Sequence, residues 1–215
     1  MVNFLVKEGD FVRLEYEGYD EDGNLFDSTK GDAAKELRGK EGPMLIVLGK
    51  DQLVKGLNDA VMKMNKGEEK DVELSSKEAF GERKKEMIRV LPEIEFRKQN
   101  INPVPGLQIH MDTSFGRLMG TIKSVTSGRI LVDFNHPLAG KKIKYKVKLV
   151  DVVTDTKEKV DSLIERMELK GTCEVKDGEA TLKLSKDAKD YEQRKSMLFG
   201  LIKTLIPEVK NVKAE

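Results

Sequence analysis

The segment 133–149 limits the possible folds of this chain more than any other part of it. It begins with a polar loop, Asp-Phe-Asn-His-Pro-Leu-Ala-Gly-Lys, and continues with apolar side chains at every second position, at Ile143, Tyr145, Val147 and Leu149. A period of two is typical of a half-buried β-strand. Residues 9–16 and 70–74 alternate in the same way. A sheet that uses all three segments must therefore accommodate a long inserted unit before its last strand.

Several short motifs precede this segment in a fixed order. They are Asp-Gly-Asn-Leu-Phe-Asp-Ser at 22–28, Leu-Gly-Lys at 48–50, Leu-Val-Lys-Gly-Leu at 53–57 and Ala-Phe-Gly at 79–81. Together with 133–149 they resemble the FKBP-type peptidyl-prolyl isomerases, most of all the SlyD-like branch and its archaeal long-type relatives. In those proteins the flap loop is interrupted by an extra small domain. The resemblance covers residues 1 to 153, and beyond them it extends only to the presence of a C-terminal extension.

The sequence therefore predicts an α+β chain in three parts. Residues 1–83 plus 136–153 should form an antiparallel FKBP-type sheet with a short helix, and the charged stretch 30–42 reads as a loop or bulge. Residues 84–135 carry four strand patterns and are expected to form an all-β insert-in-flap domain. Residues 154–215 read as a small αββα domain, in which two strands meet at Lys-Asp-Gly.

Composition excludes several classes of function. The 39 basic and 38 acidic side chains leave a net charge of +1, without the basic excess of a nucleic-acid binder. No stretch reaches the roughly 18 apolar residues of a membrane-spanning helix, and residues 2–6 are too short for a signal-peptide core. The single cysteine, Cys173, cannot form an internal disulfide. We expect a cytoplasmic protein with neither nucleic-acid nor membrane partners.

A prolyl isomerase needs no nucleophile. The barrier of about 18–20 kcal/mol arises from amide resonance, and a dry apolar pocket disfavours the planar ground state relative to the twisted transition state. In this sequence the resemblance implies substrate contacts through the backbone of Leu53 and Val54, a pocket floor at Leu57 and a flap-base residue at Phe80. The complete implied pocket is Tyr16, Phe26, Asp27, Ile46, Leu53, Val54, Leu57, Phe80 and Tyr145.

Three of these residues depart from the commonest family pattern. The floor is usually Trp and here is Leu57, which implies weaker binding of macrolide inhibitors. Phe80 lacks the hydroxyl of the usual Tyr, whereas Tyr145 adds a hydroxyl to the usual Phe and needs a partner if buried. Without the resemblance, these aromatic residues would be read as plain core residues of a sheet. Asp27 has a second possible role, which is to cap its own turn.

No metal and no other cofactor is expected. Two histidines, His110 and His136, and one cysteine offer no ligand cluster at metal spacing. Bacterial SlyD-like proteins often carry a His-rich tail that binds nickel, but this chain ends in Lys-Asn-Val-Lys-Ala-Glu. His136 is interpreted instead as a hydrogen-bonding residue of its loop.

The insert carries many apolar side chains for so small a module. Flexible methionine-bearing surfaces suit the promiscuous binding of unfolded chains, and the resemblance implies the same role. The alternative is that these side chains fill the core of the insert, which is preferred for Ile88 and Leu118. The candidate polypeptide contacts are Met87, Leu91, Phe96, Met111 and Met119.

The sequence thus predicts a peptidyl-prolyl cis-trans isomerase that is also a folding chaperone for unfolded or proline-containing polypeptides. The alternative is a holdase chaperone whose isomerase pocket is degenerate because of Leu57 and Phe80. A third possibility is a scaffold that dimerises and presents the insert to one dedicated partner. Residues 154–215 have two apolar helical stripes around a two-stranded sheet with open edges, so this segment is a candidate homodimer interface.

Overall fold

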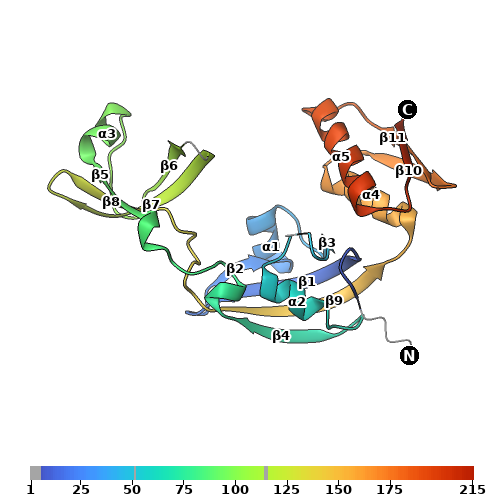
Figure 1. Cartoon of the computed structure of the whole chain (residues 1–215), viewed down its shortest axis with the longest axis horizontal. Coiled ribbons are helices and arrows are strands. Elements are labelled where there is room, and N and C mark those ends of the chain that lie inside the picture. Colours follow the sequence, from blue (N-terminus) through green and yellow to red (C-terminus); the bar gives the residue numbers. More distant parts are fainter. Residues whose placement is uncertain (1–5, 51, 114–115) are drawn as a thin grey trace. The chain divides into compact units, whose positions relative to one another are not determined.

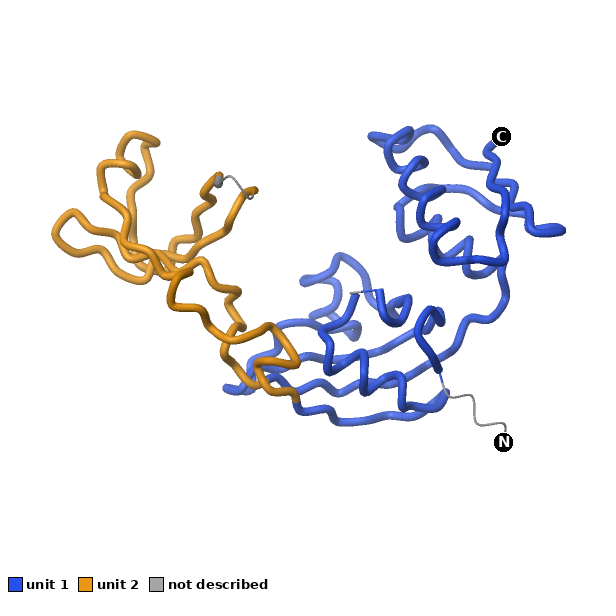
Figure 2. Tube along the Cα trace, in the orientation of Figure 1, with its two compact units in different colours: residues 1–73, 143–215 blue, residues 74–142 orange. Residues whose placement is uncertain are grey.

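The computed structural model of the chain describes residues 6–50, 52–113 and 116–215. These residues fall into two compact units, which are coloured separately in Figure 2. Unit 1 contains the chain up to Glu73 and again from Ile143, and unit 2 contains Leu74–Lys142. No helix in the described ranges is both long and apolar enough to cross a membrane.

Unit 1 is built on a five-stranded sheet with the order β2-β1-β9-β4, in which β3 also pairs with β1. β1 (Phe11–Asp20) and β9 (Ile143–Val153) run antiparallel, with Phe11 opposite Val153 and Asp20 opposite Ile143 (Figure 1). The remaining strands are β2 (Leu25–Ser28), β3 (Met44–Val47) and β4 (Glu69–Leu74). The alternating segment after residue 142 therefore lies beside the first strand of the chain, as the sequence predicts.

Two helices accompany this sheet. α2 (Lys55–Val61) buries Leu57 and Val61, as its apolar spacing predicts. The expectation of a loop over residues 30–42 is wrong, because residues 31–38 form α1 (Gly31–Arg38). Alanine, lysine, glutamate and leucine favour a helix there, Ala34 is fully buried, and Gly39 ends the helix in the left-handed conformation.

Unit 2 contains a four-stranded antiparallel sheet with the order β5-β8-β7-β6. The strands are β5 (Ile88–Pro92), β6 (Gln108–Thr113), β7 (Gly116–Thr126) and β8 (Arg129–Asp133), and two 3₁₀ turns, Ser76–Glu78 and Lys85–Met87, precede them. The insert is not all-β, because α3 (Glu93–Lys98) follows β5. Acidic residues in its first turn and basic residues in its last complement the helix dipole, and Phe96 anchors it in the core.

Polar contacts hold the two ends of the insert together. The guanidinium of Arg83 lies 2.5 Å from the carboxylate of Asp133, whose side chain is 8% exposed. The amide nitrogen of Lys84 donates to Asn135 Oδ1 at 2.8 Å, and Asn135 Nδ2 donates to the Lys84 carbonyl at 3.0 Å. The segments that enter and leave the insert are thus fixed to each other at its base.

The C-terminal segment contains α4 (Thr156–Arg166), β10 (Gly171–Lys176), β11 (Glu179–Leu184) and α5 (Tyr191–Leu205), in the predicted αββα order. A third strand, β12 (Asn211–Ala214), then pairs in parallel with β11. It was not predicted, because a run of four residues is too short to carry a strand signal of its own. Its pairing closes one of the two sheet edges that the sequence left open.

One continuous apolar core joins this segment to the five-stranded sheet. Phe11 on β1, Val47 on β3 and Val153 on β9 belong to the same buried cluster as α4, α5 and β11. Ion pairs at its margin link Arg13 to Glu158 at 3.1 Å and Lys40 to Glu165 at 3.0 Å. Much of the apolar surface of residues 154–215 is therefore covered within the chain itself.

Candidate active site

Tyr16 and Asp27 form the polar centre of the predicted pocket. Pairing of β1 with β2 brings them together, and the Tyr16 hydroxyl donates a hydrogen bond of 2.9 Å to Asp27 Oδ2. The same hydroxyl lies 3.6 Å from the sulfur of Met44. Thr29 fixes the Tyr16 backbone from both sides, since its Oγ1 accepts from the amide at 2.8 Å and donates to the carbonyl at 3.2 Å. Asp27 therefore contacts the pocket through its carboxylate.

Tyr145 packs between the two other aromatic rings of the pocket. Its ring centroid lies 6.0 Å from that of Tyr16 and 5.8 Å from that of Phe26, with interplanar angles of 79° and 80°. Edge-to-face contacts of this kind are worth about 0.5–1.5 kcal/mol beyond the buried area. Phe26 is half-buried, whereas Tyr16 and Tyr145 are 5% and 4% exposed. Three predicted residues from three strands thus form one aromatic cluster.

Gly18 makes this cluster possible, and sequence reasoning missed it. It lies on β1 opposite both Asp27 on β2 and Tyr145 on β9. A Cβ at this position would lie 2.8 Å from Phe26 Cζ and 2.8 Å from Tyr145 Cε1, closer than atoms of this kind approach each other. The available signal was a glycine inside an otherwise regular strand pattern, which often marks a close approach.

Both phenols are held in their neutral form. Burial raises the pKa of Tyr16 above its usual value, the nearby Asp27 carboxylate raises it further, and the Arg38 guanidinium partly opposes them. Burial also raises the pKa of Tyr145, with smaller contributions from Asp27 and Tyr16. Both hydroxyls therefore remain hydrogen-bond donors throughout the physiological pH range.

The Tyr145 hydroxyl is free to use this capacity. Among the described residues it has no hydrogen-bond partner, although the residue is only 4% exposed. Asn65 Oδ1 is the only side-chain nitrogen or oxygen atom of the described residues that is both fully buried and without a hydrogen-bond partner. The Tyr145 oxygen is therefore not fully buried, although its ring packs against those of Tyr16 and Phe26.

The other predicted pocket residues have different environments. Ile46 is fully buried and Leu57 is 1% exposed, whereas Leu53 and Val54 are half-buried at the start of α2. Phe80 belongs to unit 2, where its ring stacks on that of His136 with centroids 4.5 Å apart and an angle of 2°. His136 Nδ1 accepts from the Leu138 amide at 3.2 Å, which confirms its predicted role within the loop.

Comparisons with known proteins agree with this geometry. A family model described as FKBP-type peptidyl-prolyl cis-trans isomerase matches residues 4–104, and one described as FKBP26, IF domain, matches residues 89–138. The short-type peptidyl-prolyl cis-trans isomerase of Methanocaldococcus jannaschii is 31% identical over 157 residues, which cover 71% of this chain and 96% of that protein. The chain belongs to the FKBP-type peptidyl-prolyl cis-trans isomerases. The resemblance inferred from its motifs is therefore confirmed.

This FKBP-type isomerase is also similar to bacterial proteins. A probable FKBP-type 16 kDa isomerase of Pseudomonas fluorescens is 29% identical over 61% of this chain and 81% of its own length. The SlyD isomerase of Aeromonas hydrophila is 31% identical over 69% of this chain and 65% of its own length. The predicted SlyD-like character is thus supported by sequence identity as well as by motifs.

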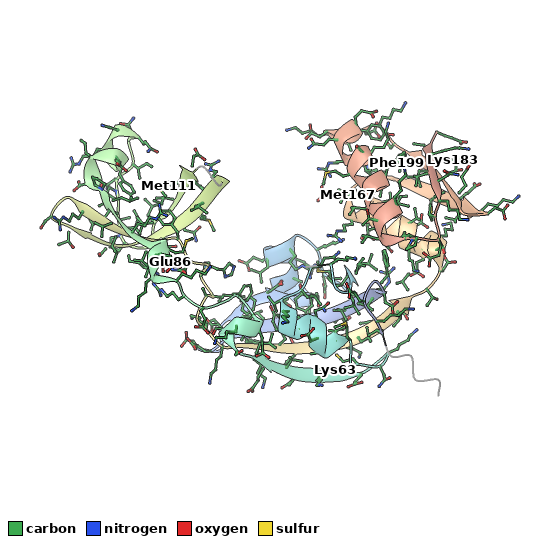
Figure 3. All side chains as sticks on the ribbon, viewed as in Figure 1. Lys63, Glu86, Met111, Met167, Lys183 and Phe199 are labelled. Carbon is green, nitrogen blue, oxygen red and sulfur yellow. The ribbon has the colours of Figure 1, made fainter. Side chains whose placement is uncertain are left out.

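The insert of this FKBP-type isomerase brings together three of its five candidate contacts. Leu91, Phe96 and Met111 line a pocket of about 50 Å³ together with residues of α3. Of these three, Met111 is labelled in Figure 3. Phe96 is only 4% exposed and is also part of the core. Met87 packs against the core outside this pocket, and Met119 is 48% exposed.

The candidate contacts do not include the two most exposed apolar side chains of the insert. Eight large apolar side chains are exposed among the described residues, and five of them lie in the insert, which are Val90, Ile94, Val104, Met119 and Val125. Val90 and Ile94 are the most exposed of these, at 59% and 56%. Methionine content directed attention to other positions, whereas these β-branched residues carry no comparable signal.

Proposed function

We propose that this isomerase twists the X-Pro bond of its substrate in the pocket of Tyr16, Phe26, Asp27 and Tyr145, and that its insert captures unfolded client chains. We assign catalysis to residues 1–83 plus 136–153, capture to 84–135 and a separate supporting role to 154–215. The aromatic cluster around Gly18 is the observation that supports the catalytic assignment most strongly.

The reaction requires an apolar environment more than it requires reacting groups. The planar amide has more charge separation than the twisted transition state, so a site that excludes water disfavours the ground state. Three aromatic side chains, two of them almost fully buried, provide such a surface. We place Ile46, Leu53, Val54 and Leu57 around it as apolar walls, and the family resemblance implies a substrate contact for Phe80.

The Tyr145 hydroxyl is the donor that we assign to the substrate. It is neutral, unpartnered and accessible, whereas the Tyr16 hydroxyl is already engaged by Asp27. A donor held in place before the substrate arrives stabilises the bound carbonyl without reorganisation during the reaction. Tyr145 would thereby supply a hydrogen bond that Phe80 lacks the hydroxyl to make.

Tyr145→Phe tests this assignment with little change in packing. Loss of one hydrogen bond of about 1 kcal/mol should lower kcat/KM for a proline tetrapeptide about fivefold. The matched control is Tyr191→Phe, which removes a hydroxyl from another buried tyrosine, on α5, outside the pocket. An unchanged kcat/KM in Tyr145→Phe, or an equal loss in the control, would contradict the donor role.

Capture of unfolded chains by the insert is supported by its exposed apolar side chains and its apolar pocket. Replacement of residues 84–135 by a short loop should leave tetrapeptide isomerisation largely intact and should slow the refolding of a proline-limited protein. If the insert is instead purely structural, both substrates will lose the same fraction of activity. If the intact protein binds unfolded chains but does not isomerise the tetrapeptide, the holdase alternative is favoured.

Two further assignments accompany this proposal. We place the protein in the cytoplasm, which is consistent with a single free cysteine that is buried. Homodimerisation through 154–215 stays a prediction. Less apolar surface is left for a second chain than the sequence implied, because β12 and the shared core cover much of the apolar surface of this segment. Light scattering of the intact chain decides it, since a dimer requires twice the mass of 24.3 kDa.

A further inference from the structure

A second cavity lies in unit 1, where the C-terminal segment meets the segment between α1 and β3. Its volume is about 320 Å³. Arg38, Lys40 and Met44 line it from one side, and Ser162, Glu165 and Arg166 line it from α4. The space is large enough for a carboxylate side chain, and its lining is mostly charged. Seven of the twelve lining residues are charged, so the cavity is a candidate site for a charged ligand.

The charges that line the cavity do not balance. Most take part in ion pairs, which are Arg13 with Glu158 (3.1 Å), Lys40 with Glu165 (3.0 Å), Glu168 with Arg194 (2.8 Å) and Glu41 with Lys35 (3.5 Å), a lysine that Asp32 also contacts at 3.0 Å. Arg38 and Arg166 differ, because neither has an ion-pair partner anywhere in the described ranges. Two guanidinium groups of the lining are therefore without an ion pair, and the lining has four basic and three acidic side chains.

The helix dipoles do not neutralise these two charges. Arg38 is the last residue of α1 and Arg166 is the last residue of α4. A helix C-terminus carries about half a negative charge, and each guanidinium carries a full positive one. The region stays positive, and a planar guanidinium binds a carboxylate through two parallel hydrogen bonds. The cavity therefore favours the binding of an anion.

The cavity adjoins the isomerase pocket. The guanidinium carbon of Arg38 lies 5.7 Å from the Tyr16 ring centroid, and the Met44 sulfur lies 3.6 Å from the Tyr16 hydroxyl. Both residues also line the cavity, so Tyr16 contacts residues that the pocket and the cavity share. An extended chain advances about 3.3–3.6 Å per residue. Two residues of a bound client therefore span the distance of 5.7 Å between the Tyr16 ring and the Arg38 guanidinium.

We propose that Arg38 and Arg166 bind a carboxylate of the client polypeptide, so that the enzyme prefers X-Pro bonds with an acidic residue about two positions away. This inference rests on the proposed catalytic pocket. Arg38 and Arg166 are specificity residues in this account, since they contact a flanking side chain and not the reacting amide.

Two pairs of peptides test the preference. Within each pair the sequences are identical except that Glu or Gln stands two residues before the proline, or two residues after it. For at least one pair, the intact protein should show a kcat/KM for the Glu peptide about fivefold above that for the Gln peptide, as expected for a partly screened ion pair. Raising the salt concentration should reduce this ratio.

Substitutions then locate the preference. Arg166→Gln and Arg38→Gln should each bring the ratio of the two rates close to one, and Arg38→Lys should retain only part of it because an ammonium cannot bind a carboxylate in the same planar way. Lys186→Gln is the matched control, since it removes an exposed charge from the C-terminal segment away from the cavity, and it should keep the full ratio.

The outcomes separate this inference from the proposed function. Acceleration of both peptides to the same extent in the intact protein overturns the carboxylate site alone, whereas acceleration of neither overturns the catalytic pocket on which it depends. A free anion has the same chemistry as a carboxylate. Equal peptide rates, together with a phosphate-induced rise in Tm that Arg166→Gln abolishes, would assign the site to a free anion and overturn its role in client selection.

Discussion

The Tyr16 hydroxyl donates a hydrogen bond of 2.9 Å to the carboxylate of Asp27, across the pairing of β1 with β2. This bond engages one of the two pocket phenols and leaves the Tyr145 hydroxyl as the free donor. In the proposed pocket the Asp27 carboxylate orients the Tyr16 ring against the aromatic cluster and takes no part in acid–base chemistry.

Tyr16→Phe should therefore affect stability and catalysis together. The variant loses one hydrogen bond and should be less stable by about 1 kcal/mol. Its kcat/KM should fall about fivefold, because the ring is no longer held by Asp27. Urea denaturation and a tetrapeptide assay measure the two effects. A fully active variant would mean that Asp27 only caps its own turn, which is the alternative that the sequence left open.

Alkaline stability provides a test of the buried phenols. Their pKa values are raised in the folded protein, so the native state keeps its phenolic protons to a higher pH than the unfolded chain does. The stabilisation is fully present below about pH 10, the ordinary tyrosine pKa, and is lost as the pH rises further. Tyr145→Phe should lose less stability between pH 9 and pH 11 than the wild type. Parallel pH profiles in urea denaturation would contradict this expectation.

Gly18→Ala should damage the site more than the fold. The new methyl group would lie 2.8 Å from both Phe26 and Tyr145, so at least one of these rings must move. We expect a loss in kcat/KM of at least tenfold, about 1.4 kcal/mol of transition-state stabilisation. Gly200→Ala is the matched control, because apart from its neighbours and the nearby backbone of α5 no atom lies within 4 Å of the added Cβ. Equal activity in the two variants would remove Gly18 from the account.

The contribution of the insert can be tested on its surface without deletion. Ile94→Ser removes a side chain that is 56% exposed on α3, and Met197→Ser removes one that is 55% exposed on α5. Only the first should weaken the suppression of aggregation of an unfolded protein. Comparable effects of both substitutions would indicate non-specific apolar binding over the whole chain.

Some parts of the fold follow from the sequence and others depend on long-range pairing. Alternation over 143–149 and the short helix of the FKBP-type sheet predict elements that the structure contains as β9 and α2. β12 could not be predicted, because its pairing with β11 depends on the completed C-terminal fold. α1 was missed for a different reason, since glycines at both ends of a charged stretch resemble a loop, although they only delimit a short helix.

Some residues of the candidate site were likewise predictable from the sequence, and others were not. Motif order selected Tyr16, Phe26, Asp27 and Tyr145, which the structure brings into contact. Gly18 and Arg38 belong to the same surroundings, but their importance depends on cross-strand register and on the position of a helix end. A motif identifies the side chains that are expected to contact the substrate. It does not identify a glycine that leaves room for them or a charged residue that lies nearby only in the folded chain.

Isomerisation of a proline-limited substrate by Phe26→Ala tests the central claim most directly. Phe26 is half-buried in the aromatic cluster, and Phe199, which is half-buried on α5 (Figure 3), is its matched control. We predict that kcat/KM of Phe26→Ala falls at least tenfold, about 1.4 kcal/mol, while folded Phe199→Ala keeps the wild-type value. An unchanged rate in folded Phe26→Ala would place the active site outside this pocket and contradict the account.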